Sequence, residues 1–126
     1  MIETIHTDYA PKAIGPYAQA VRAGEIVYTS GQIGLRPDGM LVGETVDAQT
    51  RQVLANLRHV LEAAGARMDT VIKTTIYLTD LDDFETINAI YAEAFGLHRP
   101  ARSTVEVSRL PRDAKVEIDC IARIDA

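Results

Sequence analysis

Apolar and polar residues alternate along the first part of the chain, in a pattern typical of short β-strands. Residues 1–6 alternate weakly and predict an edge strand, whereas residues 7–16 contain two prolines and a glycine and predict a loop. A hairpin is expected next, with strands at Tyr17–Val21 and Ile26–Ser30 and a turn around Ala23-Gly24.

From Val46 onward the apolar spacing changes to that of a helix. Thr45 or Asp47 can cap its start, and Gly65 can end it. A second helix is expected after the acidic segment TDLDD, and Gly96 and Pro100 end it. The predicted apolar faces are Val46, Val53, Leu54, Leu57, Val60, Leu61 and Ala64 in the first helix, and Phe84, Ile87, Tyr91, Ala94 and Phe95 in the second.

Residues 70–78 are β-branched and aromatic and predict a strand between the two helices, and residues 102–107 and 115–124 predict two further strands. The expected order is therefore β-β-β-α-β-α-β-β. This is an α+β fold with a β-sheet whose one face is buried under two helices.

The other face of this sheet has no cover within the chain. In the last strand, Val116, Ile118, Cys120, Ala122 and Ile124 share the face expected under the helices, while Glu117, Asp119, Ile121 and Arg123 share the opposite face. Tyr77, Thr75 and Val71 give the strand at 70–78 a similarly mixed second face. Another copy of the protein is the simplest cover, so we expect a homo-oligomer.

Composition is that of an ordinary water-soluble domain, and we expect one domain over residues 1–126. Apolar residues make up 47% of the chain and charged residues 25%. The apolar runs are far shorter than the roughly 20 residues that a membrane helix needs. No apolar signal segment is visible at the N-terminus, and the single cysteine, Cys120, fits a reducing compartment, so a cytoplasmic location is expected.

The net charge of −5 argues against a nucleic-acid-binding role. Basic residues are scattered, with no run longer than two, whereas phosphate recognition usually depends on a basic patch.

Arg102 and Glu117 are the candidates for chemistry. Arg102 opens a predicted strand and points to the same side as Thr104. It either pairs with a surface carboxylate or grips a substrate carboxylate with two parallel donors. Glu117 is either a solvated strand residue or a catalytic one. If the last two strands pair with each other, Arg102 and Glu117 lie on neighbouring strands and the same face, and a plain salt bridge is the alternative interpretation.

Other common chemistries are not indicated. The three histidines lack the spacing of metal ligands, and SGQIG lacks the lysine and helix of a phosphate loop. Ser30 and Ser103 lie outside any nucleophile-elbow motif, and Cys120 is expected to be a buried packing residue.

Six segments, in order and spacing, resemble one known family: IGPYAQAV, VYTSGQIGL, QTRQVLANLRHVLEAAG, VIKTTIYLTDLDDF, INAIYAEAF and PARSTVEVSRLPRDAKVEIDCIA. Together they resemble the RidA (YjgF) family of reactive enamine and imine deaminases over residues 6–124. The resemblance implies a chorismate-mutase-like fold, a mixed β-sheet with two helices on one face, assembled as a homotrimer around a central β-barrel. Active sites then lie between subunits.

The resemblance also implies roles for single residues. Arg102 would bind the substrate carboxylate, and Glu117 would position or activate the attacking water. Thr104 stands where many members carry a cysteine, so a mechanism that needs a thiol there is excluded. The remaining residues that the pattern marks as substrate-binding are Tyr17, Ser30, Gly31 and Asn88.

The implied reaction is hydrolysis of 2-aminoacrylate-type enamines and 2-iminobutanoate-type imines to 2-oxo acids and ammonia, with no metal and no cofactor. Partners would be these small acids and further copies of the chain, without nucleic acid or membrane. Two alternatives stay open: a regulatory module that senses 2-oxo acids without turnover, and an endoribonuclease or translation inhibitor.

Overall fold

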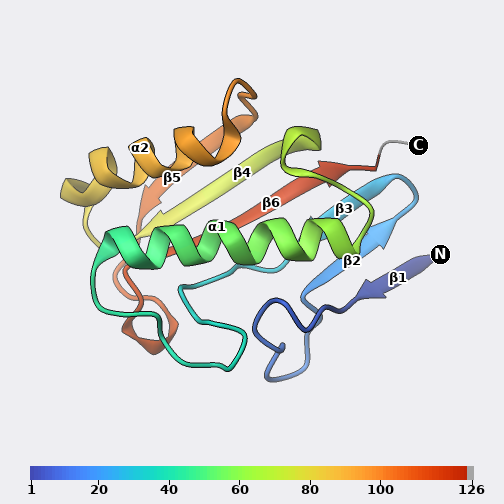
Figure 1. The fold of residues 1–126 in the computed structure, drawn as a ribbon, viewed down its shortest axis with the longest axis horizontal. Helices are drawn as coiled ribbons and strands as arrows, with labels where there is room; N and C mark the ends of the chain where they lie inside the picture. The colour runs from blue at the N-terminus through green and yellow to red at the C-terminus, as the bar shows by residue number, and fades with distance from the viewer. Residues whose placement is uncertain (125–126) are drawn as a thin grey trace.

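The computed structural model describes residues 1–124 and shows a six-stranded sheet with both helices on one face (Figure 1). The predicted order of strands and helices is confirmed, with three short 3-10 helices at Met68–Thr70, Leu81–Asp83 and Pro111–Asp113. The strands and helices are β1 (Ile2–Ile5), β2 (Ala20–Ala23), β3 (Ile26–Thr29), α1 (Val46–Ala63), β4 (Val71–Leu78), α2 (Phe84–Phe95), β5 (Ala101–Glu106) and β6 (Val116–Arg123).

The strand order across the sheet is β1-β2-β3-β6-β4-β5, and all neighbours are antiparallel except β4 and β5. The last two strands, β5 and β6, do not pair with each other, because β4 lies between them. The chain leaves β4, crosses the sheet in α2 and returns parallel to β4 in β5, as a parallel pair requires. The last strand, β6, then takes the other edge of β4.

Local capping explains where the helices begin and end. Thr45 accepts a hydrogen bond from the Ala48 backbone N–H at 3.2 Å, which starts α1, and Gly65 follows its end with a φ of 90°. The acidic segment before α2 acts differently from the prediction. Asp80 accepts from the backbone of Asp82 and so caps the short 3-10 helix, whereas no side chain caps α2 itself.

The core lies between the helices and the sheet, and most of its predicted members are confirmed. Ala94 is an exception, because α2 turns Ile90 into the core and leaves Ala94 exposed. Val71 is a second exception. The register shifts between Val71 and Lys73, and this irregularity turns Val71 into the core instead of onto the opposite face. The largest side chains that are fully buried are Leu57, Leu61, Ile76, Leu78, Ile87 and Ile118.

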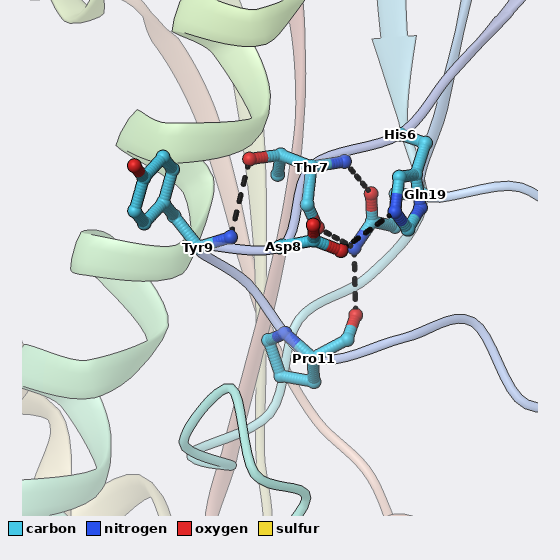
Figure 2. Close-up of polar contacts among 6 residues, drawn as sticks. All are labelled: His6, Thr7, Asp8, Tyr9, Pro11 and Gln19. Carbon is cyan, nitrogen blue, oxygen red and sulfur yellow. Dashed lines mark hydrogen bonds and ion pairs between the residues drawn. The ribbon is translucent and has the colours of Figure 1, made fainter.

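The predicted strand at Tyr17–Val21 begins later than expected, at Ala20, because the side chain of Gln19 binds the backbone of the N-terminal loop. Figure 2 shows the Gln19 side chain between Thr7 and Pro11. Its Oε1 accepts from the Thr7 N–H at 2.7 Å, and its Nε2 donates to the carbonyl oxygens of Thr7 at 3.1 Å and Pro11 at 2.8 Å. This buried amide fixes the loop that leads to Tyr17.

The face away from the helices is uncovered within one chain, as predicted. Tyr28 of β3 is 46% exposed and Val105 of β5 is 42% exposed, and both lie on this face. We call it the open face of the sheet. In the part of the chain that the structure describes, neither helix is long and apolar enough to cross a membrane.

Candidate active site

Glu117 lies on β6 and points to the open face, because its neighbours Val116 and Ile118 are fully buried under the helices. Its half-buried side chain lines a cavity of about 380 Å³. The N-terminal loop supplies Lys12 and Tyr17 to this cavity, the segment after β3 supplies Gly31, and the 3-10 helix before β6 supplies Arg112. The structure therefore brings Tyr17, Gly31 and Glu117 together.

Gly31 lies directly beside the Glu117 side chain. A β-carbon at position 31 would be 2.7 Å from Glu117 Cδ, so only glycine leaves room for this carboxyl. The neighbouring Gln32 exchanges two backbone hydrogen bonds with Ile118, at 2.9 Å and 3.1 Å, and these fix the segment against β6. The glycine is thus required for a close approach and not for a special backbone angle.

Ser30 supports the cavity from behind. Its hydroxyl donates to the Ala18 carbonyl at 2.6 Å, and its backbone N–H donates to the Gln19 carbonyl at 2.9 Å. Both bonds hold residues 18–19, which directly follow Tyr17, against the segment that carries Gly31. Ser30 therefore fixes the backbone beside the cavity, and its hydroxyl hydrogen is bonded to the Ala18 carbonyl and not directed to a ligand.

The Glu117 carboxyl has no hydrogen-bond donor among residues 1–124. Burial raises its pKa, and the nearby charge of Asp119 raises the pKa further. The sequence left the direction of this shift open, because a nearby arginine would lower the pKa. Among residues 1–124 of one chain, no such arginine acts on it. A half-buried carboxyl that holds its proton more tightly than usual is a common feature of catalytic clefts.

Arg102 lies on β5 and points to the helix side of the sheet. Its Nη1 donates to Asn88 Oδ1 at 2.8 Å, and its Cζ lies 4.9 Å from the ring centre of Tyr91 and 5.5 Å from that of Phe84. These contacts hold the guanidinium against α2. Thr74 in turn shares a 2.7 Å hydrogen bond with the Tyr91 hydroxyl, which fixes that ring.

No carboxylate among the described residues pairs with Arg102, so its charge is available to a ligand. It lines a cavity of about 490 Å³ together with Asn88, Tyr91, Arg99 and Pro100. The structure thus joins Asn88 to Arg102, and Thr104 follows on the same strand opposite Ile76. Sequence reasoning treated Tyr91 and Phe84 only as core residues. Phe84 lies four residues before Asn88 and Tyr91 lies three residues after it, and this helical spacing already indicated that the three side chains share one face of α2.

Arg102 and Glu117 lie on opposite faces of the sheet, with β4 between their strands. Thr74 pairs with Arg102 on one edge of β4, and Tyr77 pairs with Glu117 on the other. The expected juxtaposition of the two residues on one face is therefore wrong within a chain, and the cross-strand salt bridge does not form. One chain holds two half-sites, which we call the arginine half-site (Asn88, Tyr91, Arg102) and the glutamate half-site (Tyr17, Gly31, Glu117).

Comparison with known proteins places this chain and its fold in a family. The family model described as Endoribonuclease L-PSP matches residues 7–124. The 2-iminobutanoate/2-iminopropanoate deaminase of Salmonella typhimurium is 50% identical over 125 residues, which cover 97% of this chain and 98% of that protein. Reactive Intermediate Deaminase A, chloroplastic, of Arabidopsis thaliana is 50% identical over 123 residues, or 97% of this chain and 66% of that protein.

A solved structure agrees with the sequence matches. The crystal structure of E. coli TdcF with bound serine has a TM-score of 0.93 and 44% sequence identity, and the match covers 98% of this chain and 99% of that one. Identity at this level over nearly the full length shows common descent as well as a common fold. The chain therefore belongs to the Endoribonuclease L-PSP family, which is the RidA (YjgF) family that its motifs resemble.

Proposed function

We propose that the protein hydrolyses reactive 2-imino acids and their enamine tautomers to 2-oxo acids and ammonia. The observation that carries the proposal is a guanidinium that α2 holds in place through Asn88 and Tyr91 and that has no carboxylate partner among residues 1–124. Such a group is suited to a substrate carboxylate, which it can bind through two parallel donors. The names of relatives at 50% identity, including a 2-iminobutanoate/2-iminopropanoate deaminase, support the same reaction. The serine bound by TdcF is an amino acid similar in size to 2-iminobutanoate.

The complete site is formed between two copies of the chain. Arg102 and Glu117 cannot meet within one copy, because they occupy opposite faces of one sheet. The open face carries exposed apolar side chains, including Tyr28 and Val105, that a second copy would cover. In the proposed homotrimer the arginine half-site of one subunit faces the glutamate half-site of the next. Each seam then contains one active site.

The substrate carboxylate binds Arg102, and this contact presents the C=N carbon to a water beside Glu117. The Glu117 carboxylate accepts a proton from that water as the water oxygen bonds to the iminium carbon and the C=N electron pair moves to nitrogen. Glu117 then donates the proton to the amine nitrogen. The C–N bond breaks, ammonia leaves, and the hydroxyl proton passes to ammonia as the C=O bond forms. Orientation and one proton-transfer group are sufficient for this reaction.

A coupled assay tests the activity directly. Threonine dehydratase releases 2-iminobutanoate, and 2-oxobutanoate is followed with and without this protein. With the protein present, we expect 2-oxobutanoate to reach its final concentration sooner. The final concentration itself should be the same with and without the protein, because the imine also hydrolyses in water. An unchanged time course at micromolar protein would reject the deaminase proposal and would favour a module that binds 2-oxo acids without turnover.

Mixing two inactive variants tests the shared site. Arg102→Ala and Glu117→Gln each remove one half-site, and each homotrimer is expected to be nearly inactive. Denaturing and refolding the two together places both intact half-sites at about one quarter of the seams. Activity should return to about that fraction of the wild-type value. If the mixed assemblies stay inactive while light scattering finds trimers, the site does not span the seam.

The endoribonuclease alternative is less consistent with the geometry. Histidine is the side chain most often used for acid–base catalysis near neutral pH, and none lines either half-site cavity. His98 bonds the Val71 carbonyl at 2.7 Å, and His6 bonds Asp8 at 2.9 Å. The net charge of −5 also opposes binding to a polyanion.

A further inference from the structure

We infer that Asp119, held by the Tyr77 hydroxyl, is a positioning residue of the proposed deaminase, because it places a second carboxyl beside Glu117 on the open face of the sheet. The inference rests on the proposed function for its catalytic meaning. The electrostatic relationship itself depends only on the sheet.

The register of β4 and β6 builds this arrangement. Glu117 and Asp119 are two residues apart on β6, so both point to the open face and their backbones lie about 7 Å apart. Across the strand pair, Tyr77 lies opposite Glu117 and Thr75 lies opposite Asp119. The Tyr77 ring reaches diagonally, and its hydroxyl donates to Asp119 Oδ2 at 3.3 Å. One tyrosine therefore lies beside both carboxyls and holds one of them.

Charged and titratable groups from several elements surround Glu117. The cations Lys12 and Arg112 line the same cavity from the N-terminal loop and the 3-10 helix, and Arg102 of the neighbouring subunit would face it in the proposed trimer. The titratable groups that line or border it are Lys12, Tyr17, Tyr77, Arg112 and Asp119. Among these, Asp119 is the charge that raises the pKa of Glu117, in addition to burial.

Asp119 and Tyr77 are themselves coupled. Burial raises the pKa of Asp119, while the Tyr77 hydrogen bond and the charge of Lys73 lower it. Burial also raises the pKa of Tyr77, and the Asp119 charge raises it further. The hydroxyl therefore stays protonated and favours the ionised form of Asp119. A charged Asp119 in turn disfavours ionisation of Glu117, because two like charges share a half-buried face.

This coupling suits the role proposed for Glu117. A carboxyl that must first take a proton from water and then return it to a leaving amine works best when its pKa is close to the working pH. A lone glutamate at its ordinary pKa would hold that proton too weakly to donate it efficiently. Asp119 moves Glu117 toward the useful range without contacting the substrate.

The test compares Asp119→Asn and Tyr77→Phe with Asp82→Asn, which removes an exposed aspartate charge on another part of the chain. Two quantities are measured in the full assembly. The first is the titration of the Glu117 and Asp119 carboxyl carbons by NMR in protein with ¹³C-labelled glutamate and aspartate, assigned by the signals that Glu117→Gln and Asp119→Asn lack. The second is the dependence of kcat/KM on pH.

Asp119→Asn is expected to move the Glu117 titration and the acidic limb of the rate profile to lower pH together, with KM little changed. Tyr77→Phe should move the Asp119 titration to higher pH, because the ionised form loses a donor; this variant decides the matter if Asp119→Asn fails to assemble. Asp82→Asn should move neither.

An unmoved Glu117 titration in Asp119→Asn overturns the inference, and so does an unmoved Asp119 titration in Tyr77→Phe. If the titration moves but the rate profile does not, Asp119 is not a positioning residue and the catalytic assignment of Glu117 fails with it. Because the titration needs no turnover, it separates this outcome from a protein that lacks deaminase activity altogether.

Discussion

The side chain of Glu117 occupies the space in which a β-carbon on residue 31 would lie. The hypothetical β-carbon of Gly31 would be 2.7 Å from Glu117 Cδ and 2.9 Å from Glu117 Cγ, and neither distance is one that real side chains tolerate. Both residues are held by backbone pairing, since Gln32 and Ile118 exchange hydrogen bonds immediately beside them. The position of the carboxyl therefore depends on the absence of a side chain at residue 31.

Gly31→Ala is expected to displace the Glu117 carboxyl while leaving the sheet intact. A shift of about 1 Å in a catalytic group can lower a rate by about 100-fold, so we expect a loss of that order in kcat/KM for 2-iminobutanoate. The thermal midpoint should change little, because the side chain of Glu117 can swing into the adjoining cavity. Steady-state kinetics and a circular dichroism melt measure the two effects.

Gly24→Ala is the matched control, with the opposite signature. Gly24 has a φ of 62° in the β2–β3 turn, and nothing lies within 4 Å of the position that a β-carbon would take there. Alanine at this position costs about 1 kcal/mol of stability through backbone strain and should leave kcat/KM unchanged. If Gly31→Ala also lost only stability, the contact with Glu117 would have no catalytic significance.

Arg102→Ala should lower kcat/KM by about ten- to over a hundredfold, because it removes a charge-assisted contact worth about 1.5–3 kcal/mol. Arg102→Lys should recover little of this loss, since an ammonium cannot lie flat on Tyr91 while it donates to Asn88 and to a carboxylate. Arg58→Ala, which removes an exposed guanidinium from α1, is the control and should retain wild-type kinetics. Equal kinetics for Arg102→Ala and Arg58→Ala would contradict the assigned role of Arg102.

The prediction of the fold succeeded where the apolar pattern repeats over many residues. It failed where a tertiary contact overrides the local pattern. The 18 residues of α1 repeat their apolar face over five turns, and both its start at Thr45 and its end at Gly65 carry capping chemistry. The short strand predicted at Tyr17–Val21 had no such repeated apolar pattern and no capping residues to support it. Gln19 uses its amide to hold a loop twelve residues away, and no local pattern contains that information.

The candidate site was predictable as a set of residues but not as an arrangement. Strand periodicity gave the face on which Glu117 lies, and the family motifs gave Arg102 and Asn88. The sequence left open whether β5 and β6 are neighbours, as consecutive strands often are. The parallel crossover through α2 prevents this and puts β4 between them. The registers then divide the site, because Arg102 pairs with Thr74 and Glu117 pairs with Tyr77, and these two β4 residues point to opposite faces of the sheet.

Cys120 is expected to be inert in the native protein. Its side chain is buried beside Thr29, and burial raises the pKa of the thiol to about 12. The reactive thiolate is therefore nearly absent at pH 8, and reagents also lack access to the sulfur. A disulfide reagent such as DTNB should modify less than one thiol per chain over hours at pH 8, and one per chain at once in denaturant. Rapid modification of the folded protein would contradict the placement of Cys120.

Gln19→Leu should destabilise the protein by about 2–3 kcal/mol, because it leaves the buried Thr7 N–H and two carbonyl oxygens without their hydrogen-bond partners. Leucine has a similar volume, so the loss is not one of packing. Urea denaturation measures the change, and hydrogen exchange should show that the Thr7 amide has lost its protection.

Asp8→Asn is the matched control in the same loop. The pair between His6 and Asp8 is exposed, with 64% and 85% of the two side chains accessible, and its loss should cost less than about 1 kcal/mol. Gln19→Leu should in addition raise KM, because the loop that it releases carries Tyr17 into the glutamate half-site. If Gln19→Leu and Asp8→Asn proved equally stable, the buried amide would not be what holds this loop in place.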